Sequence, residues 1–401
     1  MEWLEGGITA VPGILASGVH GGIKASGKRD LALIYSSVPA RAAAVFTTNQ
    51  VKGAPVLVSM EHIRGGMAQA IVAASGVANV CTGEQGLRDA REMAKIVADL
   101  LRIPLQHVLV ASTGVIGQPL PMERIRAALP RLVKELSPKG GRHAAEGILT
   151  TDTVAKEAAL RVEVDGRPAT IGGIAKGAGM IDPHLATMFC FLATDVAISQ
   201  KALQAVLERA VERSFNRITV DGDQSTSDTV AMLSNGLAEN TPLEKGSRGL
   251  RALAQAVGSV TLRLAHMLVR GGEGATKLVE IRVTGAKSRR EALQAARSVA
   301  NSLLVKTALN GQDPNWGRIM MALGKSAATV VTDRVGIAFE DEPLVANGQL
   351  RAGARLDRIR EIMARPEFAI EVNLGLGTGG DHVWTCDLSE EYVRVNAKYT
   401  T

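Results

Sequence analysis

The stretch KGAGMIDPHLATMFCFLATD, Lys176 to Asp195, passes from two glycines through a proline into a nearly continuous apolar run. A short apolar run bounded by turn residues is typical of a buried strand. Thr187 stands where this run begins, and β-branched residues are common in strands. On composition alone, a plain strand threonine in the core is the better interpretation of Thr187.

The residues before Thr187 nevertheless permit a second interpretation. Glycines, Pro183 and the small residue Ala186 could hold the Ala186 carbonyl in a strained turn beside the Thr187 hydroxyl. Attack of the hydroxyl on that carbonyl would give an ester, and water would then release an N-terminal threonine. A free α-amine has a pKa of about 7.7–8.0, so it can accept the proton of its own hydroxyl. Self-cleavage at Thr187 is therefore an alternative hypothesis.

The bulk composition is that of a globular protein. The chain has 401 residues, 46% of them hydrophobic and 21% charged, and its length predicts two or three structural units. The longest apolar runs are shorter than the roughly 18 residues of a membrane span, and the acidic N-terminus argues against a signal peptide. The three cysteines, Cys81, Cys190 and Cys386, are widely spaced, which predicts no disulfide framework and a cytoplasmic location. None of the seven histidines forms a pair at the spacing of metal ligands, so no metal site is predicted.

The net charge of +6 raises the question of a nucleic-acid partner. The basic residues are scattered, and aromatic residues, which stack on bases, make up only 3% of the chain. We therefore expect no nucleic-acid partner and no membrane partner. An excess of positive charge also suits small acidic substrates.

Helical and strand periodicities alternate along the chain. Apolar residues recur at helical spacing over 199–215, 84–101 and 288–309. A hairpin is predicted to turn at Asp165-Gly166, and alternation predicts strands over 277–285, 335–340, 368–376 and 382–388. This mixture favours an α/β or α+β layered fold with a mixed sheet. A turn-rich patch, Glu239 to Gly249, predicts the start of a smaller lobe over about residues 245–345.

Two other motifs receive plain interpretations. GIKASGK, Gly22 to Lys28, has the spacing of a phosphate-binding loop, but Arg29 follows where Ser or Thr is needed, and no apolar strand is predicted before it. It is interpreted as a surface turn. Cys190 lies within MFCFLA and is interpreted as a small buried hydrophobe.

Several motifs in a fixed order carry a family resemblance along nearly the whole chain. They are GITAVPGILASGVHGGIKASGKRDLALI, AAVFTTNQVKGAPV, CTGEQG, ASTGVIG, ILTTDT, KGAGMIDPHLATM, VDGDQSTSDT, KTALNGQDPNWGRI and YVRVNAKYTT. In these the chain resembles the ornithine acetyltransferase family, also called glutamate N-acetyltransferase, of the arginine pathway.

The resemblance implies a self-cleaving acetyltransferase with an N-terminal threonine. The precursor would be cut between Ala186 and Thr187 into an α piece, 1–186, and a β piece, 187–401, which assemble as an α2β2 heterotetramer. Thr187 would accept the acetyl group of N-acetylornithine and pass it to glutamate by ping-pong chemistry. The implied fold is a layered α/β/β/α sandwich with a smaller lobe. No cofactor is implied, and acetyl-CoA is left open as a second acetyl donor.

The resemblance also assigns roles to named residues. Thr113 and Gly114 would form the oxyanion hole, although ASTGVIG taken alone indicates a turn after a strand. Lys176 would contact substrate, where the plain interpretation is a solvated lysine at a strand end. Thr153 would do the same, where the plain interpretation is the N-cap of a helix beginning at Val154.

Three further substrate contacts are implied toward the C-terminus. Glu273 would receive an ammonium group, and a helix C-terminal turn would equally explain its flanking glycines. Asn396 and Thr401 complete the substrate-binding set, and their role requires an ordered chain end, which is normally frayed. The DPNWGR motif is assigned no catalytic role, because a tight turn holding Trp316 explains it.

The chain departs from the family pattern at four positions. Ala74 and Val77 stand where the family has asparagines, and Gln224 and Ser227 stand where it has Thr and Asn. Two alternatives also remain open. One is a related self-cleaving aminopeptidase or amidase with water as acceptor, and the other is a non-enzymatic binding protein on the same fold.

Overall fold

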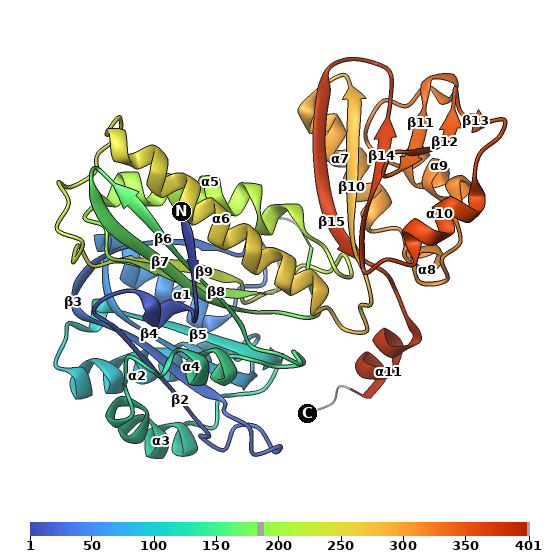
Figure 1. The fold of residues 1–401 in the computed structure, drawn as a ribbon. Helices are drawn as coiled ribbons and strands as arrows, with labels where there is room; N and C mark the ends of the chain where they lie inside the picture. The colour runs from blue at the N-terminus through green and yellow to red at the C-terminus, as the bar shows by residue number, and fades with distance from the viewer. Residues whose placement is uncertain (183–187, 399–401) are drawn as a thin grey trace. The chain divides into compact units, whose positions relative to one another are not determined.

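The computed structural model describes residues 1–182 and 188–398, and these form two compact units (Figure 1). The first unit holds Met1–Asn216 and Asp223–Leu268. The second holds Arg217–Gly222 and the described residues from Val269 on. The chain therefore enters the second unit briefly and returns to the first before it leaves for good.

The first unit is built on one nine-stranded mixed sheet with the order β1-β6-β7-β8-β9-β3-β4-β5, and β2 also pairs with β3. The long strand β3, Leu31–Phe46, joins two halves of this sheet. One half consists of β1, β6, β7, β8 and β9, and the other consists of β2, β4 and β5. The first part of β3 pairs with β2 and β4, and residues 41–46 pair with β9 after a register shift between Tyr35 and Ala40. The other strands are β1 Glu2–Leu4, β2 Ile14–Val19, β4 Met67–Val77, β5 Val108–Val115, β6 Lys156–Val164, β7 Arg167–Lys176, β8 Phe189–Thr194 and β9 Thr229–Ser234.

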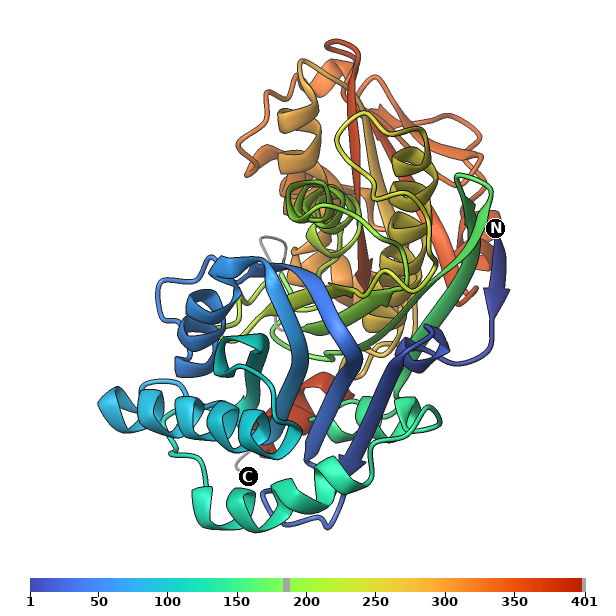
Figure 2. The same cartoon turned by 90° about the vertical axis from the view of Figure 1, so that its left-hand side faces the viewer.

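The two halves of this sheet enclose an inner core and are covered by helices outside. Ile34 of β3, Leu109 of β5 and Phe191 of β8 meet in this inner core, to which α4, Gly141–Gly147, also contributes. Figures 1 and 2 show α2 and α3 outside one half and α5 and α6 outside the other. The helices are α1 Ala54–His62, α2 Gly83–Leu101, α3 Met122–Lys134, α5 Gln200–Arg213 and α6 Arg248–Arg270. The predicted layered α/β/β/α arrangement is confirmed.

The strands around the opening stretch form as the sequence predicts. Asp165 and Gly166 both have left-handed backbone angles, φ 50° and 78°, as a two-residue hairpin of β6 and β7 requires. The apolar run after Thr187 becomes β8, which is buried throughout. β8 pairs antiparallel with β7, so that Lys176 is in register with Phe189.

Helix α6 is the one helix within the described residues that is long and apolar enough to cross a membrane. Half of its most apolar window is buried inside the protein. Leu264 lies against Gly173 of β7, and Leu253, Val257 and Val260 are fully buried. These contacts make α6 an amphipathic helix that covers the sheet of the first unit. A buried covering helix of this kind can be as long and as apolar as a membrane span.

The second unit is a six-stranded mixed sheet, ordered β13-β12-β11-β14-β10-β15, packed against helices. The sequence predicts one helix over 288–309, but the structure has two, α7 and α8. Ser302 begins the second of these by accepting a hydrogen bond from Val305 N–H, which is why the helix restarts there. The elements are β10 Leu278–Ala286, β11 Gly336–Phe339, β12 Glu342–Ala346, β13 Gln349–Leu350, β14 Glu367–Asn373, β15 Gly379–Cys386, α7 Arg289–Ala300, α8 Leu303–Asn310, α9 Trp316–Gly324, α10 Leu356–Met363 and α11 Glu390–Lys398.

Candidate active site

Lys176, at the end of β7, points into the protein and is only 2% exposed. Its Nζ donates a hydrogen bond to Thr113 Oγ1 at 3.1 Å. Thr113 belongs to β5, in the other half of the sheet, so this bond spans the inner core. The interpretation of Lys176 as a solvated lysine is therefore wrong, because the lysine is buried and bonded.

The ASTGVIG segment continues as strand β5 through Val115, and the expectation of a turn at Ser112–Gly114 is wrong. Gly114 lies in register with Gly76 of β4, and its φ is 135°. A Cβ at Gly114 would lie 2.2 Å from the Gly76 carbonyl carbon. Only glycine fits here, and the chain turns later, near Gly117.

Asp152 places a buried carboxylate beside the two lysines of this region. Its Oδ1 accepts hydrogen bonds from Lys156 Nζ at 2.5 Å and from Gly177 N–H at 2.7 Å. Burial acts to raise the pKa of Asp152, but the positive charges of Lys156 and Lys176 outweigh it and hold the pKa below its ordinary value. Asp152 is therefore ionised and compensates buried positive charge.

Asp228 is a second buried carboxyl group, on the residue before β9. Its Oδ1 accepts the N–H of Met188 at 2.8 Å, and Met188 directly follows Thr187 in the chain. Burial raises the pKa of Asp228 well above its ordinary value, although the Met188 N–H and the charge of Lys176 act against this. Together these residues are called the Lys176 cluster (Thr113, Asp152, Lys156, Lys176 and Asp228).

Thr187 and Ala186 lie outside the described residues, and so does Thr401. The described residues that follow Thr187 in the chain do contact the Lys176 cluster. Lys176 is in register with Phe189, and Met188 N–H donates a hydrogen bond to Asp228.

Thr153 is exposed, and the helix predicted after it does not form. Residues Lys156–Val164 are strand β6, which pairs with β7 along its whole length. The N-cap interpretation of Thr153 is wrong for this reason. Its neighbour Asp152 is a member of the Lys176 cluster, whereas Thr153 is not.

Glu273 and Asn396, both in the second unit, contact each other. Asn396 Nδ2, on α11, donates to Glu273 Oε2 at 2.6 Å. Gly271 and Gly272 follow the end of α6 at Arg270, as a helix C-terminal turn would have them. The structure thus brings together two of the predicted substrate contacts.

Backbone N–H groups of the GIKASGK loop are already bonded to a carboxylate of the protein itself. The Asp30 carboxylate accepts the N–H groups of Ile23 at 2.7 Å and Lys24 at 3.0 Å. A strand, β2, does precede the loop, contrary to expectation, but no helix follows it. Lys24 Nζ donates to the Leu149 carbonyl at 2.6 Å, and burial lowers the pKa of Lys24 to about 8.

The four departures from the family pattern lie in two places. Ala74 and Val77 are both buried in the core cluster that β4 forms with the outer helices α2 and α3. Gln224 is bonded to Thr48 at 2.7 Å. Ser227, beside Asp228, is buried, and its N–H donates to Ser225 Oγ at 3.0 Å.

Sequence reasoning missed three members of the Lys176 cluster, namely Asp152, Lys156 and Asp228. Both aspartates lie in motifs that carry the resemblance, ILTTDT and VDGDQSTSDT. The available signal was the presence of both aspartates in these motifs, since a carboxylate that becomes buried is expensive and needs a reason.

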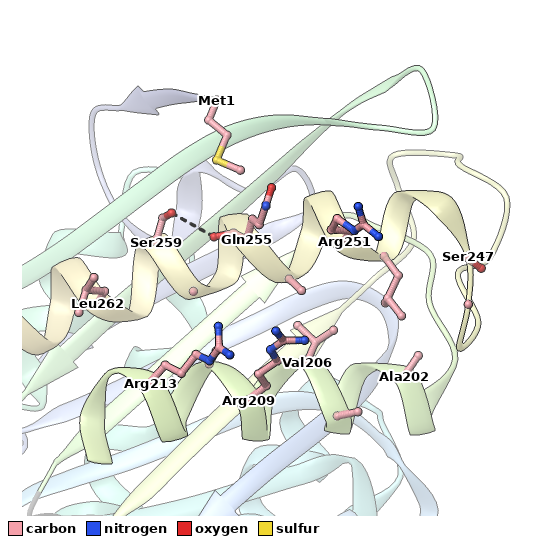
Figure 3. A pocket seen from close by; sticks show the side chains of 16 residues that line it. Met1, Ala202, Val206, Arg209, Arg213, Ser247, Arg251, Gln255, Ser259 and Leu262 are labelled. Carbon is pink, nitrogen blue, oxygen red and sulfur yellow. Dashed lines mark hydrogen bonds between the residues drawn. The ribbon is translucent and has the colours of Figure 1, made fainter. Parts of the chain in front are cut away.

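A separate cavity of about 1070 Å³ lies between α5 and α6 (Figure 3). Small side chains and three arginines, Arg209, Arg213 and Arg251, line it. It contains no member of the Lys176 cluster and none of the predicted site residues.

The described residues contain no group of three His, Cys, Asp or Glu side chains placed to hold a metal ion. All three cysteines are free thiols. Cys190 is buried, and burial raises the pKa of its thiol, as the plain interpretation of this residue requires.

Comparisons with known proteins give consistent results. The sequence profile of the ArgJ family matches residues 15–401. The arginine biosynthesis bifunctional protein ArgJ of Symbiobacterium thermophilum is 47% identical, and the match covers 100% of both chains. The protein of the same name from Geobacter sulfurreducens is 48% identical over 98% of this chain and 100% of its own. A solved structure of ornithine acetyltransferase from Mycobacterium tuberculosis, complexed with ornithine, is 43% identical over 45% of this chain and 97% of that chain, with a TM-score of 0.43.

Proposed function

The chain belongs to the ArgJ family, and from this premise we propose that it transfers acetyl groups through the hydroxyl of Thr187. It is an acetyltransferase of arginine biosynthesis that moves the acetyl group of N-acetylornithine to glutamate. The relatives are named bifunctional, and acetyl-CoA as a second donor to glutamate is part of the proposal. The mature enzyme is proposed to be a cytoplasmic α2β2 heterotetramer.

The observation that supports Thr187 is the buried charge assembled around its neighbours. Lys176 is 2% exposed and is bonded to Thr113, and the residue after Thr187 is bonded to Asp228. A protein that needed only a core threonine here would gain nothing from burying these charges, because desolvation is costly. Catalysis of acetyl transfer needs them, because a preorganised positive charge stabilises the oxyanion of the tetrahedral intermediate.

In the proposed mechanism Thr187 is first freed from Ala186 by self-cleavage. Its hydroxyl oxygen then attacks the acetyl carbonyl carbon, and the hydroxyl proton passes to the Thr187 α-amine. Thr113 and Gly114 stabilise the oxyanion, and Lys176, beside Thr113, adds positive charge. Collapse breaks the acetyl C–N bond, the proton leaves with ornithine, and glutamate takes the acetyl group from the threonine ester by the reverse steps.

We also propose which residues bind the substrate. Thr153, Lys176, Glu273, Asn396 and Thr401 are the proposed substrate contacts. The support for two of them is the 2.6 Å bond between Asn396 and Glu273, which holds a carboxylate in place for an ammonium group.

Intact-mass measurement of wild type, Thr187→Val and Thr187→Ser tests the proposal. Wild type should give two pieces, beginning at Met1 and Thr187, and should transfer acetyl from acetylornithine to glutamate. Thr187→Val, which keeps the shape but lacks the hydroxyl, should stay intact and inactive. Thr187→Ser keeps the hydroxyl and should be cut and retain activity.

The same samples separate the alternatives. Ornithine release without glutamate would indicate the amidase, since water would then be the acceptor. An unbroken wild-type chain with full acetyl transfer would overturn the proposed mechanism. An unbroken and inactive wild type would instead indicate a binding protein.

A further inference from the structure

Asp228 has a buried carboxyl oxygen, Oδ2, close in the chain fold to the residue that follows the proposed nucleophile. Asp228 is 1% exposed, and its Oδ1 accepts the N–H of Met188 at 2.8 Å. Its Oδ2 is buried and has no hydrogen-bond partner among the residues that the structure describes. Buried carboxyl oxygens are rarely left without a partner, because the lost hydration costs free energy.

Covalent geometry limits what can approach this oxygen. Thr187 is covalently bonded to Met188, and in any conformation its α-nitrogen lies roughly 2.7 to 3.7 Å from Met188 N. The Asp228 carboxyl is within hydrogen-bond distance of that same Met188 N. The Thr187 nitrogen is therefore a group that can reach the vicinity of Oδ2.

We propose that Asp228 is the positioning residue for the α-amine of Thr187, which donates a hydrogen bond to Oδ2 once the chain has been cut. This inference rests on the proposed function. The bond leaves the amine lone pair free for the Thr187 hydroxyl proton. When the amine takes that proton, the adjacent Asp228 carboxylate stabilises the new ammonium group.

The surroundings suit such a role. Met188 N–H holds one oxygen in a fixed orientation, and the hydroxyls of Thr47 and Ser225 and the charge of Lys176 also favour the ionised carboxyl. Beyond Lys176 lie Asp152 and Lys156, which are bonded to each other. A carboxyl that burial alone would keep neutral becomes ionised when a cation forms next to it, so the carboxyl and the amine titrate as a pair.

The test is Asp228→Asn, with Asp195→Asn as the matched control. Asp195 lies at the opposite end of β8, is also buried, and accepts Thr170 N–H at 2.8 Å. Burial raises its pKa as it does that of Asp228. Both changes keep the size and one oxygen acceptor, but only one of them lies beside the proposed nucleophile.

The measurements are intact mass, thermal unfolding and acetyl transfer from about pH 5.5 to 9. We expect Asp228→Asn to lower kcat by about 10²-fold or more. Its acid limb should move to lower pH by about one unit, because an amine without a neighbouring carboxylate has a lower pKa. Asp195→Asn should keep the wild-type limb and stay within a few-fold of wild-type kcat.

Each outcome decides the role of Asp228. A folded Asp228→Asn chain that is cut and shows both the lower kcat and the shifted acid limb supports it. An unchanged kcat and acid limb overturn it, and so do equal losses of activity and melting temperature in both variants. If Thr187→Val transfers acetyl normally, the proposed function itself has failed, whatever Asp228→Asn does.

Discussion

Ser112 has a buried side-chain oxygen that makes no bond. It lies on β5, is 1% exposed, and its Oγ has no hydrogen-bond partner among the described residues. In the parallel pairing of β4 and β5 it lies opposite Ala74, whose methyl group cannot bond the hydroxyl.

Ser112→Ala should therefore raise the free energy of unfolding, by about 1 kcal/mol, because it removes a buried polar group that makes no bond. Ser59→Ala is the control. Ser59 Oγ donates to the Val110 carbonyl at 2.7 Å and accepts Val110 N–H at 2.8 Å, so its loss should lower that free energy by about 1–2 kcal/mol. Urea unfolding of both variants measures the difference, and equal destabilisation would contradict it.

Single residues of the site were predictable only where the family resemblance marked them. Thr113 and Lys176 were named in advance, and the structure bonds them together. Asp152 and Asp228 were not, because an aspartate before a strand looks in sequence like a solvated turn residue. Each is bonded in the interior to a residue distant in sequence: Asp152 to Gly177, 25 residues later, and Asp228 to Met188, 40 residues earlier.

At the level of elements, strands β4 and β5 approach so closely that one glycine is required. A Cβ at Gly114 would meet the Gly76 carbonyl carbon at 2.2 Å and the Val77 nitrogen at 2.6 Å. Gly117, three residues later, also has a positive φ, 84°, but has open space around it. A substitution at Gly117 would therefore introduce backbone strain alone, whereas one at Gly114 would introduce backbone strain and steric overlap.

Gly117→Ala should cost about 1 kcal/mol of unfolding free energy, from backbone strain alone. Gly114→Ala should cost about 3 kcal/mol or more, because strain and overpacking add. Thermal and urea unfolding of the two purified variants give the comparison. Similar losses in both would show that the strands can separate at no cost, contrary to the observed packing.

Elements with strong periodicity were predictable, and those decided by distant partners were not. Helix α5 and the hairpin at Asp165-Gly166 formed as predicted. The segment Lys156–Val164 is rich in helix-forming residues before its end, yet it pairs with β7 as a strand. There the tertiary pairing outweighs local helix propensity.

On the scale of the whole molecule, the proposed cut would divide one sheet between two chains. Piece 1–186 supplies β1 to β7, and piece 187–401 supplies β8 and β9. In the sheet, β8 pairs with β7, and β9 pairs with β3. Both strands of the second piece thus lie between strands of the first.

The cut pieces should therefore remain together without any covalent link. A tag at the N-terminus should retain the piece beginning at Thr187 through washes in about 1 M NaCl, because the interface is a buried sheet and core, not screened surface charge. Denaturing guanidinium chloride should release it. Elution of the second piece by salt alone would contradict the shared sheet.

The layered architecture of the first unit followed from the sequence, but the composition of the second unit did not. The sequence predicts a lobe over about residues 245–345, whereas the second unit begins at Val269, continues well beyond residue 345 and also takes in Arg217–Gly222. Arg217 is held there by a buried ion pair with Asp381 at 3.0 Å, more than 160 residues away. Pairing over such separations leaves no periodic trace in the sequence.

The central place of β8 and β9 has a consequence for quality control. Lys176, Met188 and Asp228 reach their bonded positions only when both strands have been inserted between β7 and β3. Under the proposed self-cleavage, a misassembled copy would lack the environment for the cut, and its Thr187 nitrogen would stay in a peptide bond. Maturation would then act as a built-in proofreading step, in which only a correctly assembled copy acquires the amine that makes it active.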